Sequence, residues 1–116
     1  MGFLLKMIEQ GEIILLSYPF SNLKERKIRP AIVISNNNFN KKGDDVILVP
    51  LTSVLKEEPY SFIIEQKDLF VGKLIKPSRI RMDKIFCVDK SLILKKIGKI
   101  KEEVIKEIKK EVINLV

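Results

Sequence analysis

The segment GEIILLSYPFSNLKERKIRPAIVIS, residues 11–35, decides the fold because two apolar runs flank a charged one. The first run is rich in Ile and Leu and predicts a buried strand that ends at Pro19. The charged middle, residues 21–28, has no apolar periodicity and predicts a loop. The β-branched run at 30–35 predicts a second strand. Arg29 therefore stands where the predicted loop meets the predicted strand.

Three segments further along the chain also have the composition of strands, residues 46–53, 60–66 and 78–90. Pro50 has no N–H to donate, so its strand is expected to lie at a sheet edge or to carry a bulge at that point. In the last segment polar and apolar residues alternate, which predicts a half-buried strand, and the break at 84–86 indicates a bulge. Between the strands we expect a turn at 36–45, a loop at 54–59, and at 67–78 a turn with a short strand after Gly72.

The C-terminal residues follow a different period. Apolar side chains recur there at helical spacing, at Ile100, Val104, Ile105, Ile108, Val112 and Leu115. This pattern predicts an amphipathic helix over 100–116. Five or six short strands and one helix together predict a mainly β fold, a small β-barrel that the C-terminal helix closes. A chain of 116 residues suits one domain, so we expect a single domain over 1–116 with residues 1–10 as an N-terminal extension.

The net charge of +7 favours a polyanionic partner, such as nucleic acid, an anionic membrane or an acidic protein. The abundance of Lys and Ile offers a simpler explanation, a compositional bias. The chain has no His and a single cysteine, Cys87, which argues against serine–histidine catalysis, histidine-based zinc sites and an intrachain disulfide. No apolar stretch approaches the roughly 18 residues of a membrane span, and the first ten residues lack the pattern of a signal peptide. We therefore expect a cytoplasmic protein that binds no metal.

Polar side chains that are able to act together occur at three places where predicted strands end or face outward. Arg29 enters the second strand, Thr52 and Ser53 end the third, and Arg81 and Asp83 share the polar face of the fifth. Each place also has a simpler interpretation: a solvated turn, a strand cap, or a surface ion pair that contributes about 0–1 kcal/mol. No spacing rule within this sequence links the three places.

Several motifs nevertheless follow one another in the order of a known family. G-E-I begins at Gly11, R-P begins at Arg29, Thr52 ends a strand, and R-x-D at Arg81 precedes V-D-K. With these motifs the chain from about Gly11 onward resembles the MazF/PemK toxins of toxin–antitoxin pairs. The resemblance implies an SH3-like barrel, a homodimer, and an endoribonuclease that cuts single-stranded RNA at short sequences without a metal or other cofactor. It also implies an acidic antitoxin protein as partner.

The resemblance assigns catalysis to Arg29 and Thr52 and, through the PemK/Kid branch, to Arg81 and Asp83. Attack by the 2′-OH of RNA requires a base, hydrogen-bond donors for the phosphorane and an acid for the leaving group. It yields 2′,3′-cyclic phosphate and 5′-OH ends. Arginine forks suit phosphate oxygens, and Asp83 is able to act as the base if its surroundings raise its pKa. The RNA is expected to be bound by Lys24, Arg26, Lys27, Ser53, Arg79 and Lys84.

Two other interpretations stay open. A non-catalytic growth inhibitor on the same barrel would bind a protein, as the DNA gyrase inhibitor CcdB does, and would use the C-terminal VINLV at 112–116. The loop at 21–28 is shorter and more basic than in many family members, which fits either a loss of catalysis or a different cleavage site. A basic membrane-surface protein is the weaker third interpretation, since the apolar stripe of the C-terminal helix is needed to close the barrel.

Overall fold

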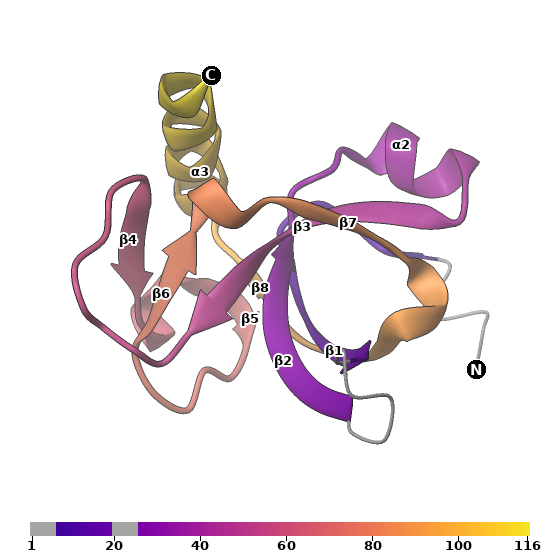
Figure 1. Ribbon diagram of the computed structural model, residues 1–116, viewed down its shortest axis with the longest axis horizontal. Helices are drawn as coiled ribbons and strands as arrows, with labels where there is room; N and C mark the ends of the chain where they lie inside the picture. The colour runs from indigo at the N-terminus through magenta and orange to yellow at the C-terminus, as the bar shows by residue number, and fades with distance from the viewer. Residues whose placement is uncertain (1–6, 20–25) are drawn as a thin grey trace.

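The computed structural model describes residues 7–19 and 26–116. Eight strands, all antiparallel to their partners, form a strongly curled sheet, a half-barrel with the order β4-β6-β3-β2-β1-β8-β5 and with β7 paired to β3 (Figure 1). The strands are β1 (Glu12–Pro19), β2 (Arg26–Val33), β3 (Asp45–Thr52), β4 (Ser61–Ile64), β5 (Leu69–Gly72), β6 (Ser78–Arg81), β7 (Phe86–Asp89) and β8 (Ile93–Ile100). The helices are α2 (Asn37–Lys42) and α3 (Glu102–Leu115), and 3₁₀ turns occur at Gln66–Asp68, Met82–Lys84 and Lys90–Leu92. The expected mainly β fold with a C-terminal helix is confirmed.

The central strand, β3, changes its partner part-way along its length. One edge pairs with β2, where Ala31 lies opposite Pro50. The other edge pairs with β7 over residues 45–48 and then with β6 over residues 51–52. Ile47 directs both its N–H and its C=O toward the β2 side, so strand alternation turns the nitrogen of Pro50 to the opposite edge. That nitrogen faces the gap between β7 and β6, where a missing N–H costs no ladder hydrogen bond.

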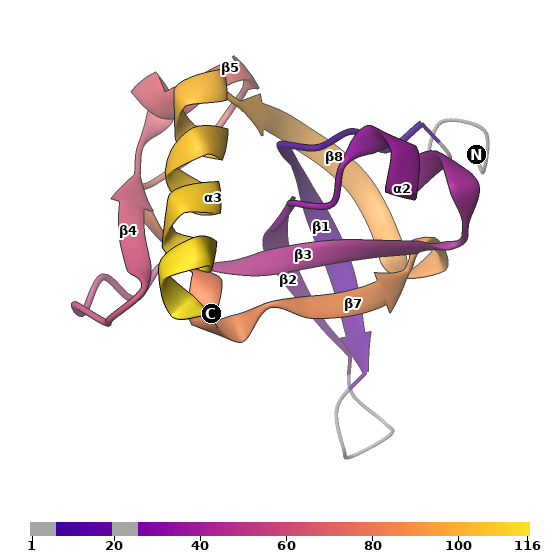
Figure 2. The same ribbon diagram turned by 90° about the horizontal axis from the view of Figure 1, so that it is seen from above.

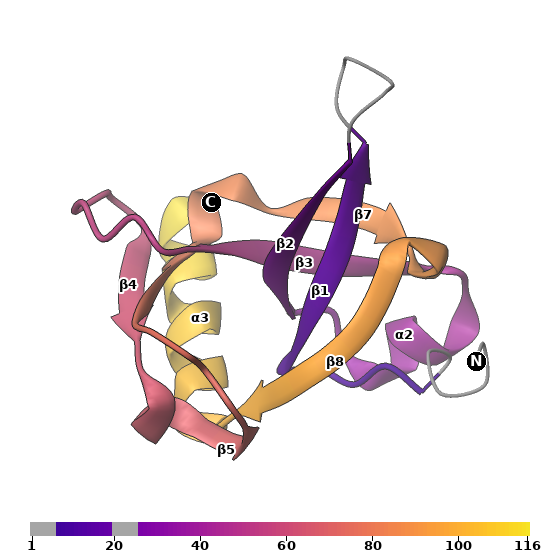
Figure 3. The same ribbon diagram turned by 90° about the horizontal axis from the view of Figure 1, so that it is seen from below.

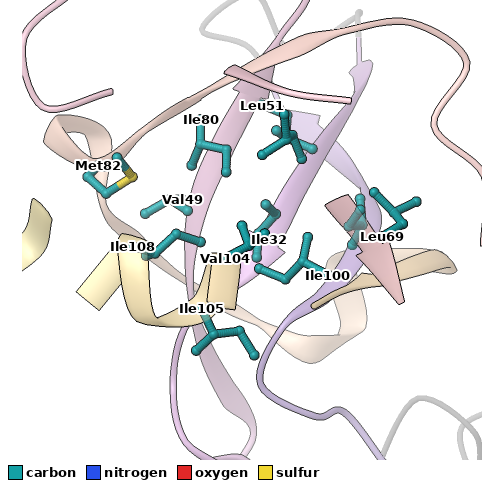
Figure 4. Close-up of a cluster of buried hydrophobic side chains, with 12 residues drawn as sticks. Ile32, Val49, Leu51, Leu69, Ile80, Met82, Ile100, Val104, Ile105 and Ile108 are labelled. Carbon is teal, nitrogen blue, oxygen red and sulfur yellow. The ribbon is translucent and has the colours of Figure 1, made fainter. Parts of the chain in front are cut away.

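The first of two buried clusters lies on the face of the sheet that α3 covers. Val49 and Leu51 of β3 point into it, and α3 contributes Val104, Ile105 and Ile108 (Figure 4). In Figure 2, α3 lies across the end of the sheet near β4 and β3. The apolar stripe expected from the sequence is thus the surface that closes this side of the fold, although the helix begins at Glu102 and Ile100 still belongs to β8.

The second cluster lies on the other face of β3, because successive side chains of a strand point to opposite faces. Val46 and Leu48 of β3 belong to it, together with Ala31 and Val33 of β2 and Ile93 of β8. Figure 3 shows β1 and β2 crossing below β3, with β8 beside β1. Both faces of β3 are therefore buried over most of its length.

The polar segment 36–45, predicted as a turn, contains the helix α2. Its N-cap is Asn36, whose side chain accepts a hydrogen bond of 2.8 Å from the N–H of Phe39. Asn40 is fully buried and exchanges hydrogen bonds with Ser35: its Nδ2 donates to the Ser35 carbonyl at 2.9 Å, and its Oδ1 accepts from the hydroxyl at 2.5 Å. Side-chain hydrogen bonds hold this helix in place of an apolar stripe, so hydrophobic periodicity does not reveal it.

Four strand assignments also differ from the expectation. The short strand β5 ends at Gly72 instead of following it, and Gly72 itself has φ +96° and lies in close contact with the backbone of Gly98. The segment 78–90 holds two strands, β6 and β7, joined by the 3₁₀ turn in place of a bulge. β8 has no counterpart in the prediction, and β2 begins at Arg26, inside the segment predicted as a loop.

Residues 7–10 of the expected N-terminal extension pack against the body of the protein. Ile8 is 3 % exposed within the second cluster. The side chain of Gln10 donates a hydrogen bond of 2.8 Å to the carbonyl of Ile34. Residues 1–6 lie outside the described part of the chain.

Removing the buried contact of α3 tests its role in closing the fold. Ile108→Ala deletes a side chain that is 2 % exposed, so the free energy of unfolding is expected to fall by about 2–5 kcal/mol. The control Ile113→Ala changes a residue of the same helix that is 70 % exposed, and it should stay within about 0.5 kcal/mol of the parent. Urea unfolding of the three proteins measures this, and equal losses in both variants would contradict the packing described.

Candidate functional site

Arg29 and Thr52 project from one face of the sheet, although they are far apart in sequence. The register pairs Ala31 with Pro50, and one step of two residues along each strand leads to Arg29 and to Thr52. Side chains two residues apart share a face. The pairing of β2 with β3 ends at Ala31 and Pro50. Beyond that point Thr52 pairs with Arg79 of β6, and Arg29 pairs with Leu16 of β1. Arg29 is exposed at this opening of the second cluster.

A groove of about 340 Å³ begins where β3 passes from β7 to β6. Four basic residues and one acidic residue line it, so its charge favours an anion. Thr52 and Arg79 stand side by side in it as cross-strand neighbours. The lining residues are Pro50, Thr52, Val54, Lys56, Glu58, Arg79, Arg81 and Lys84.

Thr52 presents its hydroxyl to this groove at the end of β3. Its Oγ1 accepts a hydrogen bond of 3.1 Å from the N–H of Val54. A hydroxyl has one proton to donate in addition to its acceptor sites. Because the described contact uses an acceptor site, the proton of Thr52 remains able to bind a substrate oxygen.

Arg81 and Asp83 form a two-pronged ion pair. The Nε of Arg81 donates to Oδ1 at 2.9 Å and its second terminal nitrogen donates to Oδ2 at 2.7 Å. The 3₁₀ turn that begins at Met82 brings the two side chains together. These hydrogen bonds lower the pKa of the Asp83 carboxyl, and they raise the pKa of Arg81. The raised pKa that a base at Asp83 requires is therefore absent here.

Arg79 differs from the sequence expectation of an outward-facing residue. It is 6 % exposed, beside the exposed loop that follows β3. One terminal nitrogen donates to the hydroxyl of Ser61 at 2.9 Å and the other to the carbonyl of Leu55 at 3.2 Å. Its Nε is buried without an acceptor. The guanidinium thus lies beneath the groove and joins three segments of the chain.

The other predicted RNA-binding residues fall into three groups. Lys84 lines the groove beside Arg81. Ser53 and Lys27 are exposed but do not line it, and Arg29 also lies outside its lining. Lys24 lies outside the described residues, and of Arg26 the structure describes only the backbone, at the start of β2.

Sequence reasoning missed four lining residues, Pro50, Val54, Lys56 and Glu58. Three of them belong to the segment 54–59, whose run of charged residues predicts only a loop. Glu58 matters most for chemistry, because it is the carboxylate that lines the groove.

Within residues 7–19 and 26–116, no group of three or more carboxylate or thiol side chains is arranged to hold a metal ion. The helices of the same ranges are too short or too polar to cross a bilayer.

The family model for the PemK-like, MazF-like toxins of type II toxin–antitoxin systems matches residues 9–116. The chain belongs to this toxin family. No curated protein sequence matches the chain. Among solved structures, a MazE–MazF structure from Deinococcus radiodurans is similar with a TM-score of 0.76 at 19 % identity, covering 94 % of this chain and 95 % of that one.

Two mycobacterial structures show the same fold as this PemK/MazF-like chain. An endoribonuclease in complex with its cognate antitoxin, from a mycobacterial species, has a TM-score of 0.74 at 18 % identity and covers 92 % of both chains. The Mycobacterium tuberculosis toxin MazF-mt6 has a TM-score of 0.72 at 14 % identity, covering 89 % of this chain and 93 % of that one. The half-barrel with its C-terminal helix is therefore the fold of this family.

The ion pair in the groove of this PemK/MazF-like protein predicts a measurable titration. In the parent, Asp83 keeps its charge to lower pH than an ordinary carboxyl, and the stabilisation by the pair is lost as pH falls through that lowered pKa. Arg81→Gln removes the positive charge and the two-pronged guanidinium donors, so the pKa of Asp83 should rise toward its ordinary value. Carboxyl-carbon NMR across acidic pH measures both proteins.

Asp89 provides the control in the same spectra. Its pKa is lowered by hydrogen bonds from Ser91, which Arg81→Gln leaves in place, so its titration should not change. An Asp83 titration that is identical in parent and variant would contradict the described pair.

Proposed function

We propose that this toxin is a sequence-selective endoribonuclease that cuts single-stranded RNA without a metal ion. The observation that carries the proposal is the basic groove at the end of β3, where Thr52, Arg79, Arg81 and Lys84 meet. Structures of similar fold include proteins described as endoribonucleases. RNA supplies its own nucleophile, the 2′-OH, so the protein has to position the phosphate and stabilise charge. The products are a 2′,3′-cyclic phosphate and a 5′-OH end.

In the proposed reaction, hydrogen-bond donors stabilise the charge that develops on the phosphorane oxygens. Arg81 is held by Asp83 and keeps three N–H groups for a ligand, two on one terminal nitrogen and one on the other. Thr52 donates its hydroxyl proton to a non-bridging oxygen. Donors fixed before the reaction stabilise the transition state without reorganising. Asp83 accordingly orients Arg81, as the lowered pKa of its carboxyl suits a permanently ionised partner.

Two carboxylates are close enough to the groove to accept the proton of the 2′-OH. Asp83 already binds Arg81 with both oxygens. Glu58 lines the groove and forms no ion pair among the described residues. We therefore assign proton uptake to Glu58. Arg29, on the same face at the opening of the sheet, contacts the phosphate from the other side when the RNA lies across β3.

The remaining parts of the proposal concern partners. A chain with this charge and this groove suits a homodimer, in which two grooves offer a longer path for RNA. An acidic antitoxin would neutralise the basic groove, and structures of similar fold include complexes with an antitoxin. An RNA substrate is consistent with a cytoplasmic protein.

Charge-conserving variants test catalysis apart from binding. Arg29→Lys keeps the charge but loses the planar fork, so cleavage should slow by roughly tenfold to a thousandfold while RNA binding changes little. Thr52→Val keeps the shape and removes the hydroxyl, and it should have a similar but milder effect. The measurement is the rate of RNA cleavage in EDTA, with mapping of 5′-OH ends.

Matched variants in the same assay assign the other roles. Lys106→Arg, on the exposed side of α3, should cleave like the parent. Glu58→Gln should slow cleavage more than Asp83→Asn does, since only Glu58 takes up the proton. Cleavage that is lost in EDTA and restored by magnesium would contradict the mechanism, and so would equal rates in the parent, Arg29→Lys and Thr52→Val.

A second candidate function, a growth inhibitor that binds a protein target, rests on the C-terminal residues. Ile113 is 70 % exposed and Val116 is 97 % exposed, an apolar end that a protein partner would cover. This candidate is favoured if the parent inhibits growth without producing new 5′-OH ends and if removal of residues 113–116 abolishes the inhibition.

A further inference from the structure

Among the described residues, Arg79 is the one charged residue that is buried. Its guanidinium has five N–H donors, and two hydrogen bonds are described for it, both to uncharged acceptors, Ser61 and Leu55. No carboxylate pairs with it in the described part of the chain. The positive charge of Arg79 is therefore buried without a counter-ion.

Such an arrangement is unfavourable for folding alone. Removing a charge from water is costly unless an opposite charge or a full set of hydrogen bonds compensates it. The neighbouring Arg81 shows the usual solution, a carboxylate with two hydrogen bonds. Arg79 faces the same groove without one, and its Nε is buried and unpaired.

We propose that Arg79 is a phosphate-binding residue, whose missing counter-ion is a phosphodiester of the RNA. This inference rests on the proposed function. The cross-strand neighbour Thr52 marks where the scissile phosphate lies, and Arg79 binds that phosphate or the next one from beneath. The bonds to Ser61 and Leu55 fix the guanidinium before the ligand arrives, which reduces the entropy lost on binding.

The salt dependence of RNA binding tests this proposal, because a purely structural role of Arg79 leaves it unchanged. The probe is a 2′-O-methylated RNA decamer, which cannot be cleaved by 2′-OH attack. Its affinity for the protein is measured between 50 and 200 mM KCl, because the affinity of phosphate contacts changes strongly over this range. Arg79→Met removes the charge and retains the volume. We expect its affinity to fall by about tenfold to a hundredfold, and the slope of log affinity against log salt to become shallower by about 0.7.

Two matched variants separate charge from structure. Ser61→Ala removes an acceptor of Arg79 but leaves the guanidinium charged, so its salt slope should equal that of the parent. Lys106→Met removes one positive charge from the exposed side of α3 and should leave affinity and slope unchanged. If Arg79→Met does not fold, Arg79→Lys replaces it: the slope should stay, and affinity should fall severalfold because the fork is lost.

The outcomes distinguish this inference from the proposed function. Suppose that the parent cleaves RNA, but that Arg79→Met has an unchanged salt slope or Arg79→Lys an unchanged affinity. This result overturns the role of Arg79 and leaves the endoribonuclease function in place. A parent that neither binds the decamer nor cleaves RNA overturns both. If Arg79→Met loses affinity for polyglutamate but keeps its affinity for the decamer, the buried charge serves an acidic protein partner. That result would also overturn this inference.

Discussion

The structure depends on the change of partner in β3 at Pro50. A proline in a central strand normally breaks a ladder of hydrogen bonds, but here its nitrogen faces the gap between β7 and β6. Up to that point side chains of β3 are buried on both faces, among two apolar clusters. Beyond it one face stays apolar, with Leu51 under α3, while the other turns polar at Thr52. The same constraint therefore closes the core and opens the groove.

The groove and the neighbouring opening of the sheet combine basic residues in three electrostatic states. Arg81 is compensated by Asp83, Arg79 is buried without a counter-ion, and Arg29 is exposed at the opening of the sheet. A fully paired set of charges would leave little attraction for a polyanion, and a fully exposed set would be screened by salt. Burial of one uncompensated charge directly beneath the groove gives a site whose attraction is less screened. Ser61 and Leu55 hold the buried guanidinium of Arg79 in position, and Asp83 holds the half-buried guanidinium of Arg81.

The sequence predicted those parts of the fold that hydrophobic patterns encode. The Ile- and Leu-rich run of β1, the third strand and the stripe of α3 are of this kind. α2 was missed because Asn36 and Asn40 stabilise it through hydrogen bonds, and β8 was missed because its lysines and Gly98 interrupt any alternation. The motifs singled out Thr52, Arg81 and Asp83 as candidates, but no local pattern reveals that Thr52 lies beside Arg79, or that Arg79 is buried, because both depend on the pairing of β3 with β6.

The central claim is that the polar face beyond Pro50 is where this toxin binds RNA. NMR of the protein with a 2′-O-methylated RNA oligonucleotide tests it most directly, through the hydroxyl and methyl signals of Thr52 and the guanidinium N–H signals of Arg79 and Arg81. These signals are expected to shift on addition of RNA, while those of Lys106 on α3 stay in place. A second groove, of about 590 Å³, is lined by lysines that include Lys73 and Lys95. Shifts confined to that groove, with Thr52 and Arg79 unchanged, would contradict the account.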